Sequence, residues 1–85
     1  MEFKLSEMCQ VPDEWKAGIG RKFRHHKGGH YRLLGLAPHS ETLEPMAVYC
    51  LLYGDGGLWV RPAKMFFETI EVNGHQLRRF EMVEG

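Results

Sequence analysis

Cysteine is scarce in this 85-residue sequence, and its two cysteines, Cys9 and Cys50, stand far apart. No C-x-x-C pair is present, so the sequence predicts neither a zinc ribbon nor a redox motif of the thioredoxin type. A disulfide between the two thiols is the alternative. We expect two reduced thiols in a cytoplasmic protein instead, because Cys9 falls in an irregular leading segment and Cys50 in a strand pattern.

An excess of either charge is also lacking, because 11 Lys and Arg balance 11 Asp and Glu. Proteins dedicated to nucleic acid or to membrane surfaces normally carry a basic surplus, so this balance argues against both classes. No apolar run approaches the length of a membrane span. The N-terminus has no basic region followed by an apolar core, so no secretory signal is predicted.

What is present indicates one small globular domain preceded by an arm. Hydrophobic residues make up 44% of the chain, which fits a globular protein, but 85 residues can bury only a small core. The arm, residues 1–20, has one helical signal from Pro12 to Gly18, with acids in the first turn. We expect Trp15 to dock this arm on the domain, residues 21–85, or on a neighbouring chain.

Short strand patterns alternate with turn signals from Arg21 onward. Gly28-Gly29 is expected to supply positive φ angles to the first hairpin, and Asn73-Gly74 predicts a type I′ turn. A single 3₁₀ turn is predicted after Pro62, with Met65 and either Phe66 or Phe67 directed inward. The predicted strands cover residues 22–27, 30–37, 46–53, 58–61, 69–72 and 77–83.

Six short strands in so short a chain suit a small closed barrel better than a sandwich. Phe23 is the expected core residue of the first strand and Val60 that of the fourth, while Phe80 and Met82 should point the same way. The predicted fold class is therefore mainly β, a small barrel of five to six short strands with one 3₁₀ turn, plus a partly helical N-terminal arm.

Several motifs, taken together and in order, carry a resemblance to a known family. They are His26-Lys27-Gly28-Gly29-His30-Tyr31, Ala37-Pro38-His39-Ser40-Glu41-Thr42, Val48-Tyr49, Leu52-Tyr53-Gly54, Leu58-Trp59-Val60-Arg61-Pro62, and Met65-Phe66 with Glu68. From Phe23 to Val83 the chain resembles the bacterial family called domain of unknown function 1653. Members of that family are similar to SH3-like β-barrels, so the resemblance implies this fold. It implies no activity, because none is established for the family.

Cys50 stands where the family often has another residue, so a special role for this thiol would be particular to this chain.

Trp59 and Arg61 are the most informative candidate site residues. On a strand they share one face and Val60 takes the other, so a core Val60 would leave Trp59 partly exposed beside Arg61. Exposed Trp and Arg are enriched in binding surfaces, and Tyr53 with Tyr49 would extend such a patch.

A structural interpretation of the same residues stays open. In it, Trp59 closes one end of the barrel and Arg61 forms an ion pair with Asp55 or Glu68.

The loop His39-Ser40-Glu41-Thr42 places a histidine, a hydroxyl and a carboxylate at the predicted barrel mouth, where they would recognise a ligand. A Ser40 nucleophile is not predicted, because sequence neighbours seldom reach catalytic geometry and no oxyanion-hole sequence is evident. The alternative is local turn chemistry, with the Ser40 and Thr42 side chains bonded to backbone amides.

Five histidines raise a metal hypothesis. His26 and His30 flank the Gly28-Gly29 turn, and His39 with Glu41 would add ligands. No pair has the helical spacing of a known zinc motif, so we predict surface histidines and neither a metal nor another cofactor.

Basic residues concentrate early in the chain. Tyr31 and Trp59 would then be stacking platforms in a nucleic-acid-binding alternative. The basic residues are Lys16, Arg21, Lys22, Arg24, Lys27 and Arg32.

These observations favour a non-enzymatic recognition module that binds a peptide, a protein partner or a small ligand. The alternatives, in order, are a nucleic-acid-binding module that uses the early basic strand, and a histidine-based metal site or hydrolase. No membrane partner is predicted, and we expect a monomer or a weak homodimer. The predicted ligand-binding residues are His26, Lys27, Tyr31, His39, Ser40, Glu41, Tyr53, Trp59 and Arg61.

Overall fold

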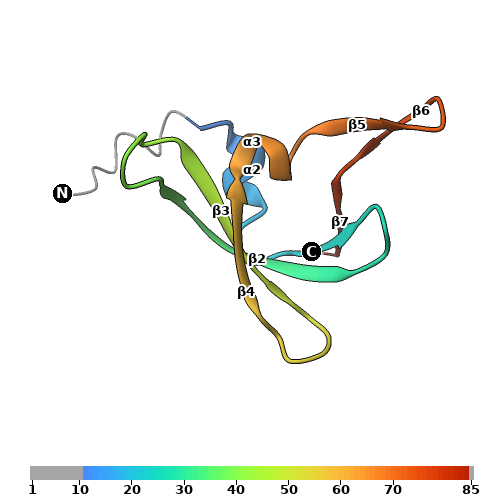
Figure 1. Cartoon of the computed structure of the whole chain (residues 1–85), viewed down its shortest axis with the longest axis horizontal. Helices are drawn as coiled ribbons and strands as arrows, with labels where there is room; N and C mark the ends of the chain where they lie inside the picture. Colours follow the sequence, from blue (N-terminus) through green and yellow to red (C-terminus); the bar gives the residue numbers. More distant parts are fainter. Residues whose placement is uncertain (1–10, 85) are drawn as a thin grey trace.

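The computed structural model describes residues 11–84, and strands dominate this part of the chain (Figure 1). Its elements are α2 (Asp13–Ala17), β1 (Lys22–His25), β2 (His30–Pro38), β3 (Pro45–Leu51), β4 (Leu58–Pro62), α3 (Ala63–Phe66), β5 (Thr69–Val72), β6 (His75–Arg78) and β7 (Phe80–Glu84). The predicted mainly β class is confirmed.

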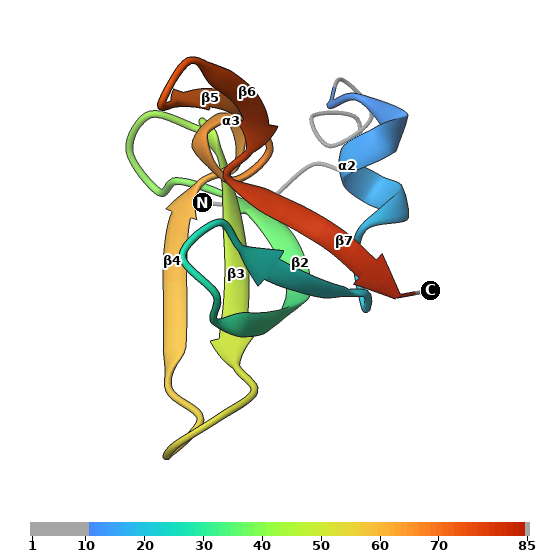
Figure 2. The ribbon, with the colours of Figure 1, turned by 90° about the vertical axis from the view of Figure 1, so that its right-hand side faces the viewer.

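Five of the strands form one antiparallel sheet in the order β4-β3-β2-β1-β7, while β5 and β6 pair separately as a hairpin. The register between β2 and β3 shifts between Leu33 and Gly35. An irregularity of this kind bends a strand and increases its twist. Figure 2 shows the resulting curl, with β4 at one edge of the sheet and β7 running across it.

The predicted closed barrel is wrong, because the sheet stays open between its two edge strands. Within the described residues, β4 pairs only with β3, and β7 pairs only with β1. The chain leaves β4 through α3 and the β5–β6 hairpin, and it returns beside β1 rather than beside β4. Side chains cross the opening instead, since the Arg61 guanidinium of β4 lies 5.5 Å from the centre of the Phe80 ring of β7.

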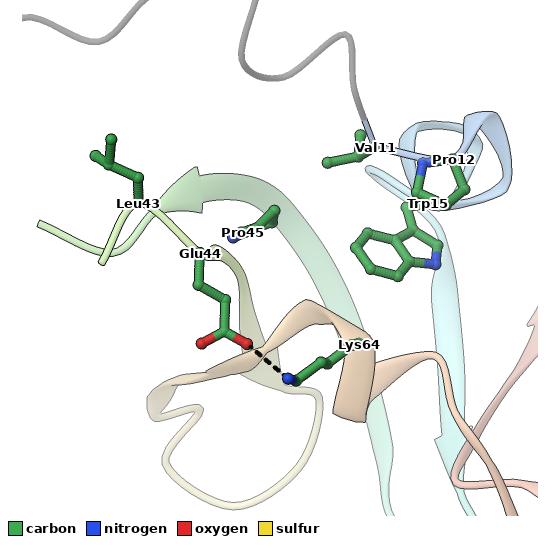
Figure 3. Close-up of a pocket in the computed structure, with 7 residues that line it drawn as sticks. All are labelled: Val11, Pro12, Trp15, Leu43, Glu44, Pro45 and Lys64. Carbon is green, nitrogen blue, oxygen red and sulfur yellow. Dashed lines mark ion pairs between the residues drawn. The ribbon is translucent and has the colours of Figure 1, made fainter. Parts of the chain in front are cut away.

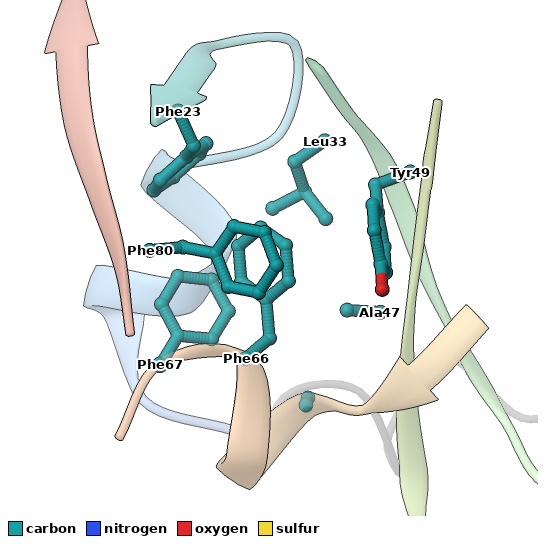
Figure 4. Packing of buried hydrophobic residues seen from close by; sticks show 8 residues of the cluster. Phe23, Leu33, Ala47, Tyr49, Phe66, Phe67 and Phe80 are labelled. Atoms are coloured by element: carbon teal, nitrogen blue, oxygen red, sulfur yellow. The ribbon is translucent and has the colours of Figure 1, made fainter. Parts of the chain in front are cut away.

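Aromatic rings fill the core between the curled sheet and α3 (Figure 4). Phe66 stacks on Phe80 with ring centroids 4.1 Å apart, and Phe23 meets Phe66 edge-on at 5.1 Å. Stacked and edge-on geometries suit the quadrupoles of aromatic rings and add to the free energy of burial. Phe23 is thus a core residue, as predicted. Met82 and Phe80 lie opposite Phe23 and His25, two alternate residues of β1, so they point to one face of the sheet, as predicted.

The predicted inward face of β4 is wrong: Val60 was expected to face the core, and it does not. Trp59 lies opposite Tyr49 in the sheet, and Tyr49 is buried in the core. The core therefore lies on the side of Trp59 and Arg61, and Val60 points outward with 60% of its surface exposed. Aliphatic character favoured Val60 in the sequence, but the core beneath β4 is built from Ala47 and Tyr49.

The helical turn and the last strand also differ from prediction. Residues Ala63–Phe66 form an α-helical turn rather than a 3₁₀ turn, because the Phe67 N–H bonds to the Ala63 carbonyl at 3.0 Å. Both Phe66 and Phe67 are buried, so Met65 points outward instead of inward. The single strand predicted over residues 77–83 is interrupted at Arg79, and β6 and β7 join different partners.

The turn predictions are partly correct. Asn73 and Gly74 have φ angles of 53° and 81°, as a type I′ turn requires. In the first hairpin only Gly28 has a positive φ, at 114°, so the expectation for Gly29 is wrong. Gly29 serves another purpose, described below.

Helix α2 packs on the core of its own chain. The Trp15 ring stacks on Phe67 at 5.3 Å, with the ring planes 7° apart, and Arg78 donates to Glu14 at 2.8 Å. The predicted docking of Trp15 therefore occurs within one chain. Cys9, which carries the disulfide alternative, lies outside the described residues, and Cys50 is a half-buried thiol.

Candidate functional site

Tyr31 and Tyr53 come together beside the first hairpin. Their hydroxyl oxygens lie 3.3 Å apart and share a hydrogen bond. Gly29 permits this approach, because a Cβ at that position would lie only 2.9 Å from the Tyr53 hydroxyl and 3.1 Å from a Tyr31 ring carbon. The second glycine of the hairpin is thus required for close packing rather than for its backbone conformation.

The hydrogen bond with Tyr53, followed by burial, raises the pKa of Tyr31 to about 12. The Tyr31 ring also packs edge-on against Tyr49 at 5.5 Å and Phe80 at 5.4 Å. At neutral pH Tyr31 therefore keeps its proton, and its ring is held by the core.

Arg61 lies opposite Ala47 in the sheet, with its guanidinium over Phe80. Within residues 11–84 no carboxylate lies within ion-pair distance of it, so the structural interpretation that pairs Arg61 with Asp55 or Glu68 is wrong. Glu68 instead accepts hydrogen bonds from Arg79, with 2.9 Å between Nε and Oε1.

Arg61 is one of several basic groups near His25. Burial lowers the pKa of His25, and the nearby His26, Arg61, Arg79 and Lys27 lower it further. Basic groups thus gather around His25, although the whole chain is neutral.

Trp59 and Tyr53 supply exposed aromatic surface next to this charge. Trp59 is 55% exposed on the Arg61 side of β4, and Tyr53 is 51% exposed. We call Tyr31, Tyr53, Trp59 and Arg61 the aromatic patch. All four were predicted as ligand-binding residues, and the structure places them along the inner side of the open sheet.

Trp59 also borders an open groove on the outer side of the sheet. This outer groove has a volume of about 510 Å³ and is mostly apolar. It brings His39 to the same groove as Trp59, but on the side of the sheet opposite to the aromatic patch. The single binding surface predicted for the loop and the patch therefore stays a prediction. Its lining residues are Ala37, Pro38, His39, Met46, Val48, Leu58, Trp59 and Val60.

The His39 loop itself is held by local turn chemistry. The His39 Nδ1 accepts the backbone N–H of Glu41 at 3.0 Å and that of Thr42 at 3.3 Å. Thr42 Oγ1 accepts the N–H of Glu44 at 3.2 Å. The alternative interpretation of this loop is thus correct for Thr42, with His39 taking the place predicted for Ser40. Ser40 and Glu41 lie exposed at the tip.

His26 and Lys27 lie at the turn after β1. The His26 ring lies 4.4 Å from the ring of His25, whose Nδ1 accepts the Lys27 N–H at 3.1 Å. They border the aromatic patch through His25, which meets Tyr31 edge-on at 6.4 Å.

Residues 11–84 contain neither a group of metal ligands nor a membrane-spanning helix. No group of three His, Cys, Asp or Glu side chains there has a metal-binding arrangement, so the metal hypothesis gains no ligand set from this part of the chain. Neither of the helices described is long and apolar enough to span a bilayer.

The basic strand β1 lies between β2 and β7. Glu81 of β7 is the sheet partner of Arg24, and the Arg32 guanidinium donates to the Gly20 carbonyl. The acids of β7 thus stand beside the predicted basic surface. The nucleic-acid alternative remains a prediction.

A further hollow of about 560 Å³ lies between α2, the β2–β3 loop and α3 (Figure 3). Trp15 and Val11 border one side, and an ion pair of 3.5 Å between Lys64 and Glu44 borders the other. None of the predicted site residues lies here.

Comparison with known proteins identifies the family. The pattern of the family described as "Protein of unknown function (DUF1653)" matches residues 21–82. The chain belongs to the DUF1653 family. A crystal structure of a DUF1653 protein from Bordetella bronchiseptica is 36% identical, with a TM-score of 0.69, over 76% of this chain and 86% of that chain. No curated protein matches the chain.

Within this DUF1653 protein, the matched region contains the aromatic patch and the outer groove but not α2. Sequence reasoning missed two exposed residues of that region, Leu58 and Val60, which are 71% and 60% exposed. The signal was available: Leu58-Trp59-Val60 is apolar on both faces of a short strand, which indicates either a fully buried strand or an edge with an unoccupied surface.

Proposed function

We propose that this DUF1653 protein is a non-enzymatic recognition module of the bacterial cytoplasm that binds a carboxylate-bearing segment of a partner protein at the aromatic patch. One observation carries the proposal. The half-buried Arg61 guanidinium has no carboxylate partner within residues 11–84, although two half-exposed aromatic side chains stand on the same side of the sheet.

The chemistry of the patch suits an acidic ligand. The Phe80 ring packs against one side of the Arg61 guanidinium and restrains this side chain. A carboxylate that binds to the guanidinium therefore costs little additional side-chain entropy. The cations around His25 add favourable potential. Desolvation of Trp59 and Tyr53 supplies the apolar part of the binding free energy.

The state of the His39 loop supports binding rather than catalysis. A serine nucleophile needs a base within hydrogen-bond reach. His39 Nδ1 accepts two amide N–H groups of its own loop, so the neutral ring carries its proton on Nε2 and has no free acceptor for the Ser40 hydroxyl. We therefore assign His39 to the wall of the outer groove, where it would contact the same partner.

The test is selection from a phage-displayed library of random dodecapeptides. We expect enriched peptides to carry Asp or Glu next to apolar residues, and to shift the amide signals of Tyr53, Trp59 and Arg61. Arg61→Gln should weaken their binding about tenfold, since a charge-assisted hydrogen bond contributes about 1.5 kcal/mol.

The matched control is Arg24→Gln, which removes an exposed arginine of β1 and should leave binding unchanged. Enrichment without acidic residues, or equal binding by the Arg61→Gln variant, would contradict the assignment of Arg61. Failure to enrich any peptide would contradict the recognition function itself.

A further inference from the structure

Strand β4 is an edge strand with an unusual lack of protection. It pairs only with β3 among the described strands, and three successive side chains, Leu58, Trp59 and Val60, are each more than half exposed. Natural proteins usually protect an edge with lysine, a bulge or a covering loop, because unpaired main-chain groups recruit other strands. Apart from Arg61, β4 has only Pro62 at its end.

The sheet register shows which main-chain groups of β4 are free. The Leu51 N–H donates to the Gly57 carbonyl at 3.0 Å, just beyond the pair Cys50 and Leu58. Hydrogen-bonded and non-bonded pairs alternate along an antiparallel ladder, so Trp59 and Arg61 bond toward β3. The N–H and C=O of Val60 therefore point toward the open edge.

We propose that β4 pairs with β4 of a second copy of the chain, antiparallel, about a twofold axis at Val60, to form a reversible homodimer. The two Val60 residues exchange both N–H···O=C bonds across the axis, and the two five-stranded sheets become continuous. This inference rests on the main-chain edge of β4 and goes beyond the proposed carboxylate binding, although Trp59 and Arg61 take part in both.

The side chains of β4 are complementary to themselves in this register. Trp59 lies opposite Arg61 of the second copy on both sides of the axis, and a guanidinium over an indole ring is a favourable cation–π pair. Leu58 lies opposite Pro62, and Val60 opposite itself, so apolar groups also meet.

Other registers lose these matches. An axis at Arg61 places two guanidinium groups opposite each other, which is repulsive. An axis at Trp59 places Arg61 opposite Gly57. It also places Trp59 at the centre of the new strand pair, although the N–H and C=O of Trp59 already bond to β3. A closed twofold interface uses the same patch on both copies, which an unprotected edge of this kind provides.

The interface is small, because one strand of five residues and the rim of the outer groove form it. Interfaces below about 1,200 Å² are typically weak, so we expect a dissociation constant on the order of 100 µM.

The first test is sedimentation velocity of the full chain from about 10 µM to about 1 mM. We expect the weight-average mass to rise from the monomer value of 9.9 kDa toward twice that value. Trp59→Lys places a cation opposite Arg61 and should weaken the dimer more than tenfold. Trp59→Glu forms a cross-strand ion pair with Arg61 and should stay within about threefold of the wild type.

Met82→Lys is the matched control, because it adds the same charge to an exposed position on the other edge strand, β7. It should leave the dimer unchanged. A chain that is monomeric at 1 mM overturns the proposal, and so does equal weakening by Trp59→Lys and Trp59→Glu, which would indicate nonspecific apolar association.

The second test is crosslinking through single cysteines, with Cys9→Ser and Cys50→Ser in both variants. Val60→Cys places two thiols at the axis, with Cα atoms about 5.5 Å apart, within disulfide range. Leu58→Cys places the two thiols at positions offset by four residues along the strands. Their Cα atoms are then about 14 Å apart, too far for a disulfide. We expect air oxidation to crosslink the Val60→Cys variant only, and equal crosslinking of both, or of neither, overturns the register.

Discussion

Gly29, Tyr31 and Tyr53 set the shape of the aromatic patch at the scale of single residues. The absence of a side chain at Gly29 lets the Tyr53 hydroxyl reach that of Tyr31. Tyr31 in turn connects this surface pair to the core, because its ring meets both Tyr49 and Phe80. Gly29→Ala should therefore move Tyr53 away from the patch without unfolding the core.

The raised pKa of Tyr31 predicts a loss of stability in alkaline solution. The unfolded chain releases this proton near pH 10, whereas the folded chain holds it until about pH 12. The stability linked to this hydroxyl is therefore complete below pH 10 and declines as the pH rises toward 12. Tyr53→Phe removes the hydrogen bond and should move the Tyr31 pKa back toward 10.

Ultraviolet titration of the three tyrosines measures this pKa, and urea unfolding between pH 8 and pH 12 measures its effect on stability. The alkaline decline should become smaller in the Tyr53→Phe protein. A late-titrating tyrosine that persists unchanged in this variant would show that the hydrogen bond is not the cause.

At the scale of elements, the sequence predicts where strands and turns lie better than which way they face. The turn at Asn73-Gly74 is specified by these two residues alone. Both positions need a positive φ, and few residue pairs adopt that conformation at low energetic cost. The direction of Val60 depends instead on what lies beneath β4, namely Tyr49 and Ala47 from β3. No local signal carries that information, and two faces of mixed polarity leave both orientations possible.

The interruption at Arg79 is equally nonlocal. Its N–H bonds to the Glu68 carbonyl and its own carbonyl accepts the His26 N–H, so one residue links β5, β1 and the last strand. The members of the aromatic patch could be predicted because Trp59, Arg61 and Tyr53 are close in sequence, but the face of β4 that Trp59 and Arg61 share was predicted as the outer one and is the inner one. The outer groove could not, since it depends on a sheet register that puts Pro38 and His39 on the same face as Val60, with β3 between β2 and β4.

The helical turn α3 offers a direct comparison of neighbouring residues. Phe66 is fully buried between Phe23, Tyr49 and Phe80, whereas the adjacent Met65 is 38% exposed. Phe66→Ala should lower the free energy of unfolding by about 3–5 kcal/mol through lost burial and an unfilled cavity. Met65→Ala should lower it by less than about 1 kcal/mol. Thermal unfolding of both variants tests whether Phe66, and not Met65, faces the core. Similar losses of stability in the two variants would contradict this assignment.

At the scale of the whole molecule, the folded unit extends beyond the region that defines the family. The family pattern begins at residue 21, yet Trp15 covers Phe67 and the Glu14 carboxylate bonds to Arg78. An open sheet in a small domain has few ways to complete its core, and α2 supplies one of them. The helix is too short to be stable alone, so its order depends on this packing.

Removing the arm should therefore destabilise the domain rather than leave it unchanged. A chain shortened to residues 21–85 loses the Trp15 stack and leaves Phe67 facing water, whereas Trp15→Ala in the full chain loses the stack alone. We expect Trp15→Ala to lower the free energy of unfolding by about 2 kcal/mol, below the value for a fully buried Trp because this side chain is only partly buried. The shortened chain should lose at least as much stability. Its urea m-value should also be lower than that of the full chain, because less surface becomes exposed when it unfolds. Equal stability of the full and shortened chains would mean that Phe67 is protected without α2, and that the family region alone is the folding unit.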